Sequence, residues 1–219
     1  MEGLVTPGFW SGKSVLVTGH TGFKGAWLCH WLTGLGAKVS GIALPPETTP
    51  NLFDILRIGA RIDRHILCDI RDRSATAEAV AGLAPEIVFH MAAQPIVRRA
   101  HAEPAETFDT NVMGTVNLLE SLRPVPALKT VVAITTDKVY DNREWPWPYR
   151  ETDPLGGHEP YGASKAAAEM VISAYRASYF EPPGRRLIAV RAGNVIGGGD
   201  WSDFRIVPDI VNAFASRSP

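Results

Sequence analysis

The stretch VLVTGHTGFKG, residues Val15–Gly25, decides the fold of this 219-residue chain. The stretch opens within an apolar run over 14–17, its glycines stand three apart at Gly19, Gly22 and Gly25, and an apolar stretch that favours a helix follows over 26–35. A strand, a tight glycine turn and a helix start cradle a pyrophosphate, because glycines admit the backbone close to the anion and the helix N-terminus is positive. The stretch therefore predicts a dinucleotide-binding βα unit rather than a glycine-rich loop without a ligand.

Strand and helix signals alternate along the rest of the chain. Apolar and β-branched runs predict five further strands, over 38–44, 62–67, 86–90, 130–135 and 186–190. Helices are predicted over 51–58, 73–83 (with Ser74 as a possible cap), 104–122, 162–180 and 207–215. The segment 142–158 is rich in Trp, Pro and Gly, which is typical of a loop. Repeated βα units predict an α/β, doubly wound parallel sheet of order 3-2-1-4-5-6, a Rossmann fold, with ligands at the carboxyl ends of its strands.

Composition fits a globular domain and disfavours several classes of function. The chain is 45% hydrophobic, and its 22 basic and 23 acidic residues leave a net charge of −1 without a basic run, so nucleic-acid binding is not expected. Its two cysteines, Cys29 and Cys68, form neither a metal-binding spacing nor a disulfide framework. The start MEGLVTPGFW lacks the features of a signal peptide, and no apolar run reaches the roughly 20 residues that span a bilayer. We therefore expect a cytoplasmic protein with no membrane partner and no metal.

Polar residues gather where the second and third predicted strands end. Asp69, after the third strand, could accept a hydrogen bond from an adenine amino group, or instead cap a helix or pair with a nearby arginine. The acid that usually holds the ribose 2′-hydroxyl is missing at the end of the second strand, where the next carboxylate is Glu47. No arginine lies there either, so this position leaves NAD and NADP both open.

Three more polar groups follow the later strands. The small residues of HMAAQ, 90–94, either let the backbone pass a flat cofactor ring or form a tight packing corner. Thr136-Asp137-Lys138 ends a dry strand, where polar side chains are costly unless they are used, although a solvated loop start is the common alternative. Tyr161 and Lys165 stand four apart on one face of a predicted helix, where the ammonium and an oxidised nicotinamide would both lower the tyrosine pKa. This spacing is common by chance, but together with the glycine loop and Thr136 it favours catalysis.

Six stretches resemble the extended short-chain dehydrogenases/reductases of the NAD-dependent epimerase/dehydratase type. They are GHTGFKGAWL (19–28), CDIRD (68–72), VFHMAAQPIVR (88–98), TNVMGTVNLLE (110–120), TTDKVYDNREW (135–145) and VRAGNVIGGGDW (190–201). The GHTGFKG form and the long loop with Trp145 and Trp147 are similar to the branch of 4,6-dehydratases that acts on CDP-glucose. The dTDP-glucose branch carries Asp-Glu in place of Asp137-Lys138. The UDP-N-acetylglucosamine branch keeps Asp-Lys but places its tyrosine sooner.

The resemblance implies an internal redox reaction in deoxysugar biosynthesis of the lipopolysaccharide type, with NAD as cofactor and CDP-glucose as small-molecule substrate. Tyr161 would take the proton of the 4-hydroxyl as hydride leaves C4, Thr136 would hydrogen-bond that hydroxyl, and Lys165 would tune Tyr161 and hold the nicotinamide ribose. Lys138 would be the base at C5 and Asp137 the acid for the departing 6-hydroxyl. A basic Lys138 must be neutral, which requires burial or a neighbouring cation, whereas a solvated Lys138 would only orient the sugar.

Binding residues also follow from the resemblance. It places the cofactor against Gly19, Thr21, Gly22, Phe23, Gly25, Asp69, Ile70, Ala92, Ala93, Gln94, Asn111, Thr135, Tyr161 and Lys165. It places the substrate against Gln94, Asn194 and Arg205, with turn chemistry as a rival explanation for Asn194. The helices over 105–122 and 162–180 are candidates for a homodimer interface.

The expected organisation is an NAD-binding domain over 1–192 and the start of a substrate-binding region over 193–219. Because family members run well beyond this length, we expect cofactor binding with little or no turnover. The alternatives are another extended-family dehydratase or epimerase acting on a UDP- or dTDP-sugar, or a non-catalytic NAD-binding protein. The last is disfavoured because a mere binder needs none of Thr136, Tyr161 and Lys165.

Overall fold

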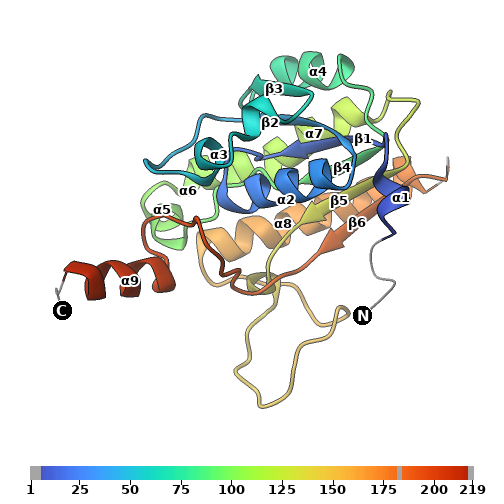
Figure 1. The fold of residues 1–219 in the computed structure, drawn as a ribbon. Coiled ribbons are helices and arrows are strands. Elements are labelled where there is room, and N and C mark those ends of the chain that lie inside the picture. The colour runs from blue at the N-terminus through green and yellow to red at the C-terminus, as the bar shows by residue number, and fades with distance from the viewer. Residues whose placement is uncertain (1–5, 182–183, 217–219) are drawn as a thin grey trace.

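The computed structural model describes residues 6–181 and 184–216, and its centre is a parallel sheet with helices on both faces (Figure 1). The strands are β1 (Ser14–Thr18), β2 (Lys38–Ala43), β3 (Arg64–Leu67), β4 (Ile87–His90), β5 (Thr130–Ile134) and β6 (Arg186–Val190). They lie in the order β3-β2-β1-β4-β5-β6, and every neighbouring pair is parallel. The predicted doubly wound fold and its strand order are confirmed.

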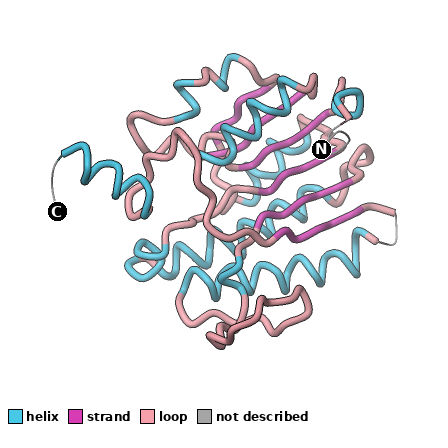
Figure 2. The backbone as a smooth tube through the Cα atoms, turned by 60° about the horizontal axis from the view of Figure 1, so that its bottom comes forward, coloured by secondary structure: helices cyan, strands magenta, loops and turns pink. Residues whose placement is uncertain are grey.

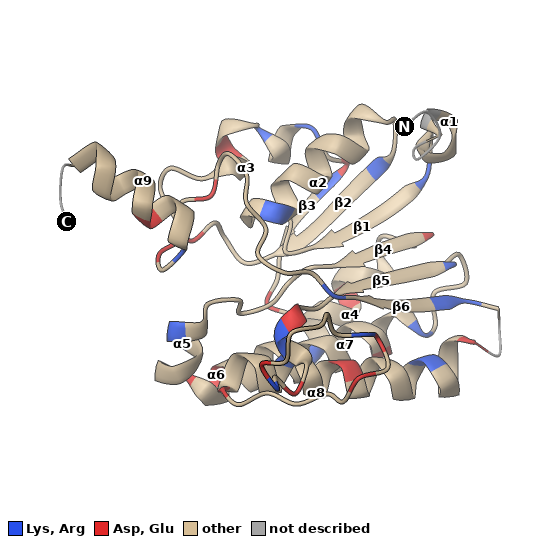
Figure 3. Ribbon diagram, turned by 90° about the horizontal axis from the view of Figure 1, so that it is seen from below, with Lys and Arg blue, Asp and Glu red and all other residues tan. Residues whose placement is uncertain are grey.

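Helices connect the strands and cover the sheet. They are α1 (Pro7–Trp10), α2 (Phe23–Gly34), α3 (Leu52–Ile55), α4 (Arg73–Ala81), α5 (Val97–Ala102), α6 (Pro104–Phe108), α7 (Gly114–Leu122), α8 (Pro160–Tyr175) and α9 (Ile206–Ser216). Shorter turns are η1 (Ile58–Ala60), η2 (Asp109–Met113), η3 (Asp137–Val139) and η4 (Arg176–Phe180). Figure 3 shows α2 and α3 on one side of the sheet and α4, α7 and α8 on the other. The sheet is therefore the middle of three layers.

Strand β1 is buried on both faces, which explains why its residues Val15, Leu16 and Val17 are all apolar instead of alternating between apolar and polar. Its side chains point to opposite faces in turn, so Val15 and Val17 pack with α2 while Leu16 packs with α7. All three are at most 1% exposed, as expected for a central parallel strand that is covered on both sides. The glycine loop is thus held at the carboxyl end of the most buried strand.

Several local features differ from the sequence prediction, of which three bear on the site and its helices. The helix predicted over 104–122 is interrupted by η2, a π-helical turn, and helix α5 was not predicted. Ser74 does not cap α4; the cap is Asp72, whose carboxylate accepts from the Ala75 N–H at 3.0 Å and from the Ser74 hydroxyl at 2.9 Å. An ionised carboxylate is the stronger acceptor at a helix N-terminus, which explains the difference.

The segments after β5 and β6 extend from the sheet. The predicted loop between β5 and α8 lies below the sheet in Figure 1. Helix α9 extends away from the other elements in Figure 2. None of the α9 residues is buried. Basic and acidic positions are interspersed over the described residues (Figure 3). Within that part of the chain, no helix combines the length and apolar character needed to cross a bilayer.

Candidate active site

The glycine loop is shaped by close backbone contacts. A Cβ on Gly25 would lie 2.1 Å from the Gly19 carbonyl oxygen, and one on Gly19 would lie 2.8 Å from the Ala92 nitrogen. A Cβ on Gly22 would come no closer than 3.4 Å to any described atom. Gly19 and Gly25 are therefore required by packing, whereas Gly22 keeps space open at the start of α2. This geometry fits a pyrophosphate approaching the N–H groups of that helix start.

A cleft of about 830 Å³ runs along the carboxyl ends of the strands. Most of the predicted site residues line it, namely Gly19, Thr21, Gly22, Phe23, Gly25, Asp69, Ile70, Ala92, Ala93, Gln94, Thr135, Thr136, Lys138, Tyr161, Lys165, Asn194 and Arg205. Its size is within the range of ordinary ligand sites. The segment after β6 passes over the start of α2, where the Trp27 indole donates to the Gly198 carbonyl at 2.9 Å.

Tyr161, Lys165 and Thr136 meet in the wall of this cleft, and all three are buried. Tyr161 stands in the first turn of α8, which Glu159 caps by accepting from the Tyr161 and Gly162 N–H groups at 2.7 and 2.6 Å. Burial raises the Tyr161 pKa, while the Thr136 hydroxyl and the Arg205 guanidinium partly offset this effect. In the chain by itself, loss of hydration thus outweighs the charges around the phenol, and the lowering of the Tyr161 pKa expected beside an oxidised nicotinamide stays a prediction.

Lys165 is a buried cation held by the sheet. Its ammonium donates to the Ile134 carbonyl at 3.0 Å, at the end of β5. Burial and the nearby Lys24 ammonium lower the Lys165 pKa to about 8, against the opposing effect of Glu169. Burial, and then Arg205, lower the pKa of the partly buried Lys24. Three cations thus repel one another around the cleft, and an anion such as a pyrophosphate would relieve that repulsion.

Lys138 and Asp137 follow β5 as predicted but are less buried than the mechanism would require. Their charged groups lie 3.7 Å apart, with 44% of the Lys138 side chain and 54% of the Asp137 side chain exposed. Lys138 lines the cleft. Asp137 is not among the lining residues, but it accepts a hydrogen bond at 3.1 Å from the hydroxyl of Thr136, which does line the cleft. The burial expected for a neutral Lys138 is therefore not present in the chain by itself.

Asn111, which the resemblance assigns to the cofactor, is not among the residues that line the cleft, and that assignment stays a prediction. It lies in the π turn η2, is 1% exposed, and accepts from the Gln94 N–H at 2.8 Å. Its amide nitrogen donates to the Gln94 carbonyl at 3.1 Å and to the Ser164 hydroxyl at 2.9 Å. Asn111 therefore positions the β4 loop against helix α8.

Gln94 and Ile70 line the cleft, but their side chains also contact other residues of the protein. The Gln94 amide donates to Thr107 at 2.8 Å and accepts from the Ile96 N–H at 2.6 Å. The Ile70 side chain packs against Gly114, where a Cβ would lie 2.5 Å from its terminal carbon. Direct ligand contacts from these two residues remain predictions.

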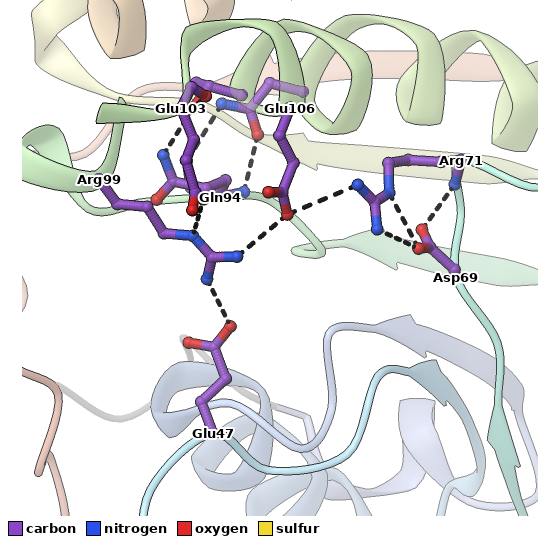
Figure 4. A network of polar contacts seen from close by, with 9 residues as sticks. Glu47, Asp69, Arg71, Gln94, Arg99, Glu103 and Glu106 are labelled. Carbon is purple, nitrogen blue, oxygen red and sulfur yellow. Dashed lines mark hydrogen bonds and ion pairs between the residues drawn. The ribbon is translucent and has the colours of Figure 1, made fainter. Parts of the chain in front are cut away.

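Asp69 and Glu47 lie at the end of the cleft that the sequence assigns to adenosine. The Asp69 carboxylate accepts from the Arg71 guanidinium at 2.6 Å and from the Arg71 N–H at 2.9 Å, so the arginine pairing, one of the alternatives for Asp69, is present, and its contact with adenine stays a prediction. These bonds lower the Asp69 pKa. Figure 4 shows this pair joined through Glu106 to Arg99, which reaches Glu47 on the loop after β2.

Sequence reasoning missed two buried polar groups beside the site. Glu169, one helical turn after Lys165, is 7% exposed and accepts from Thr135 at 2.7 Å and from Arg191 at 2.9 Å. Arg191 also lies over the Tyr140 ring, 4.7 Å from its centroid, and donates to the Glu151 carbonyl at 3.3 Å. The ion pair therefore connects β5, β6, α8 and the long loop. The i+4 spacing from Lys165 to Glu169 was the only signal in the sequence.

His90 is the second buried group. Thr18 accepts from the Met91 and Ala92 N–H groups, so its hydroxyl hydrogen is free to bond His90 Nδ1 at 2.8 Å. His90 Nε2 lies 3.0 Å from the Thr115 hydroxyl, which itself donates to the Asn111 carbonyl. These donors and acceptors fix a neutral ring protonated at Nε2, in line with a pKa that burial, and then Lys165, lower to about 3. Hydrogen bonds thus join the glycine loop, the β4 loop and α8.

Side chains of the kind that bind metals are dispersed over the described part of the chain. Among residues 6–181 and 184–216, no three His, Cys, Asp or Glu side chains are grouped as a metal site would require. The two cysteines are buried thiols rather than a disulfide.

Residues 15–219 match the NAD dependent epimerase/dehydratase family. A CDP-glucose 4,6-dehydratase from Salmonella typhimurium is 54% identical over 219 residues, which cover 98% of this chain and 61% of that protein. A UDP-glucose 4-epimerase from Mycolicibacterium smegmatis is 30% identical over 91% of this chain and 71% of that protein. The chain thus spans about three fifths of the Salmonella protein's length.

Two solved structures of related enzymes share the fold. A dTDP-glucose 4,6-dehydratase double mutant from Streptomyces venezuelae, with NAD and DAU bound, matches with a TM-score of 0.80 and 26% identity over 93% of this chain and 62% of that one. The UDP-glucose 4-epimerase of Thermus thermophilus in complex with NAD matches with a TM-score of 0.75 and 29% identity over 93% and 61%. With the glycine loop and the Tyr161–Lys165 pair in one cleft, the chain belongs to the NAD dependent epimerase/dehydratase family.

Proposed function

We propose that the chain carries the NAD-binding and catalytic part of a CDP-glucose 4,6-dehydratase, which converts CDP-glucose into CDP-4-keto-6-deoxyglucose and water. The observation that carries the proposal is the meeting of Tyr161, Lys165 and Thr136 with the glycine loop in one cleft. The 54% identity to the Salmonella enzyme supports the choice of CDP-glucose. Residues 1–192 would form the cofactor domain, and 193–219 would begin the part that holds the nucleotide sugar.

The cleft suits NAD along its whole length. Gly22 and the start of α2 would face the pyrophosphate, Asp69 the adenine, and Lys165 the nicotinamide ribose. When bound, NAD supplies a hydride acceptor at sugar C4 and a hydride donor at C6. The Lys24, Lys165 and Arg205 cations would favour the negative charges of the cofactor and the sugar nucleotide.

Tyr161 is the proposed base for the 4-hydroxyl. Its raised pKa keeps the phenol protonated in the chain by itself, so it must lose that proton before it can accept another. Arg205 favours the tyrosinate, and Thr136 is placed beside the phenol to hydrogen-bond the same sugar hydroxyl. Closing the cleft over a substrate would strengthen both effects by excluding water.

Lys138 and Asp137 are the proposed pair for the elimination step. Loss of the C5 proton to Lys138 and protonation of the 6-hydroxyl by Asp137 would together release one water across C5–C6. Lys138 lines the cleft, so a bound sugar would cover its half-exposed ammonium and supply the burial that the role of base requires. If Lys138 stays charged, its role is to orient the sugar.

Turnover of several sugar nucleotides tests the substrate assignment. CDP-, UDP- and dTDP-glucose are compared by the absorbance of the 4-keto product in base. The comparison uses the chain alone and a chimera in which the remaining C-terminal part of the Salmonella enzyme follows residue 219. We expect a clear preference of the chimera for CDP-glucose. Equal or faster reaction of UDP-glucose, or its conversion to UDP-galactose, would instead support an epimerase or a dehydratase of another branch.

We also propose a homodimer formed by the segments 105–122 and 162–180. Both carry exposed apolar side chains, including Met113 at 48% and Met170 at 62% exposure. The small residues of α8, such as Ala163 and Ala167, would allow a second helix to approach closely.

A further inference from the structure

Two arginines lie at the end of the cleft where the sequence left NAD and NADP open. Arg71 follows β3 and Arg99 lies in α5, and both line the cleft together with Glu47 and Glu106. An arginine near the end of β2 commonly accommodates the 2′-phosphate of NADP. Taken alone, these two guanidinium groups would favour the phosphorylated cofactor.

Carboxylates face every nitrogen of both guanidinium groups (Figure 4). Arg99 donates from Nε to Glu103 at 2.9 Å, from Nη1 to Glu47 at 3.2 Å and from Nη2 to Glu106 at 3.0 Å. Arg71 donates from Nε and Nη2 to Asp69 at 2.9 and 2.6 Å, and its Nη1 lies 3.5 Å from Glu106. We call these residues the adenosine-end network: Glu47, Asp69, Arg71, Arg99, Glu103 and Glu106.

The network carries more negative than positive charge. Four carboxylates share two guanidinium groups, and the pKa of Asp69 is lowered by its bonds to Arg71, so that carboxylate stays ionised. A third arginine of this wall, Arg98, has its guanidinium carbon 4.6 Å from the Phe204 ring centroid. A phosphate entering here would therefore meet surplus carboxylates and would have to displace them from Arg71 or Arg99.

We propose that the adenosine-end network makes the cleft selective for a ribose 2′-hydroxyl over a 2′-phosphate, with Glu47 and Glu106 as the specificity-determining residues. This inference rests on the proposed binding of NAD in the cleft. Glu47 lies on the loop after β2, where the ribose is expected, and Glu106 bridges both arginines. The usual acid at the end of β2 is missing. The preference for a 2′-hydroxyl would come instead from carboxylates that already pair with Arg71 and Arg99 and so keep these arginines from binding a 2′-phosphate.

The test measures dissociation constants of NAD and NADP for the wild-type chain and for Glu47→Gln, Glu106→Gln and the double variant. Glu47→Gln removes the carboxylate that faces one nitrogen of Arg99, and Glu106→Gln removes the one that faces a nitrogen of each arginine, so each substitution also removes one repelling charge. We expect the ratio of the NADP to the NAD constant to fall about tenfold for the double variant at low ionic strength, and by less at high salt. Arg99→Gln should change the ratio in the opposite direction.

Glu86→Gln is the matched control. Glu86 also pairs with two cations, Lys13 at 3.1 Å and Lys129 at 2.7 Å, but it directly precedes β4 and so lies at the amino ends of the strands, opposite to the cleft. It changes the net charge by as much as either single substitution and should leave the ratio unchanged. Binding of ADP and of 2′,5′-ADP provides a second reading that needs no nicotinamide, and circular dichroism checks that each variant is folded.

The outcomes separate this inference from the proposed function. If wild type binds neither NAD nor ADP, the proposed cofactor site and this inference both fail. If wild type binds NAD but prefers NADP, or if Glu86→Gln shifts the ratio as much as the double variant, the network is not the selective element. An unchanged ratio in a folded double variant would also refute it.

Discussion

Tyr161 combines two opposing influences, burial that raises its pKa and the Thr136 and Arg205 groups that lower it. Since the phenol is protonated near neutral pH, the rate of a chimera with turnover should increase with pH as the tyrosinate forms. Tyr161→Phe removes the base, and we expect it to lower kcat by about 100-fold or more while leaving the NAD dissociation constant within about twofold. Tyr175→Phe, at the far end of the same helix, is the control. Unchanged turnover of Tyr161→Phe would contradict the mechanism.

His90 should make the fold sensitive to acid. Its pKa is about 3 in the folded chain against an ordinary 6.5, so the unfolded chain binds the extra proton first. The free energy of unfolding should therefore fall as pH decreases from about 6.5 toward 3. His90→Gln keeps a hydrogen-bonding group between Thr18 and Thr115 but cannot be charged, so it should reduce this slope. Urea unfolding at pH 7, 6 and 5 measures the effect, with exposed His101→Gln as control; equal slopes for His90→Gln and wild type would contradict it.

At the scale of elements, the Glu169–Arg191 pair holds the catalytic helix to the ends of β5 and β6. Removing one partner leaves a buried charge, so Glu169→Gln or Arg191→Met should each destabilise the fold by about 3–5 kcal/mol. The double variant should lose less than the sum of the two. Chemical denaturation measures these losses, with Glu86→Gln at a more exposed pair as a milder control. Strict additivity of the two substitutions would show that the pair is not coupled.

Elements with a strong local pattern could be predicted from the sequence. Strand β6 was predicted with its observed bounds, and α8 and β1 within a few residues, because buried runs and helical spacing are continuous there. Helix α5 has six residues, which is too short for a periodic signal. The π turn η2 was missed because one extra residue per turn leaves the surrounding pattern of apolar residues helical.

At the scale of the whole molecule, the proposed dimer can be tested at one exposed side chain. Met170 on α8 is 62% exposed, and a charge there would be buried between two copies if α8 lies in the interface. Met170→Glu should therefore shift a sedimenting dimer to monomer, while Glu78→Gln on α4 should not. A wild-type chain that sediments only as a monomer would remove the proposal.

The site was predictable where its residues are close in sequence and was missed where the fold joins distant segments. The glycine loop and the Tyr161–Lys165 pair each belong to one turn or helix, and the structure brings both to one cleft. By contrast, the contact of Arg99 with Glu47 spans 52 residues, and that of Arg191 with Glu169 joins two elements. Asn111 was assigned to the cofactor by resemblance, whereas its buried bond to Gln94 depends on η2, which has no sequence signal.

The hydrogen bond from the Trp27 indole to the Gly198 carbonyl has a practical consequence. It ties the segment after β6 to helix α2 next to the glycine loop, and the indole remains 43% exposed. Any ligand that moves this segment must lengthen or break that bond, and indole emission is sensitive to hydrogen bonding and to water. Trp27 is therefore a built-in fluorescent reporter, whose signal, obtained as the difference between wild type and Trp27→Phe, can follow cleft opening in real time.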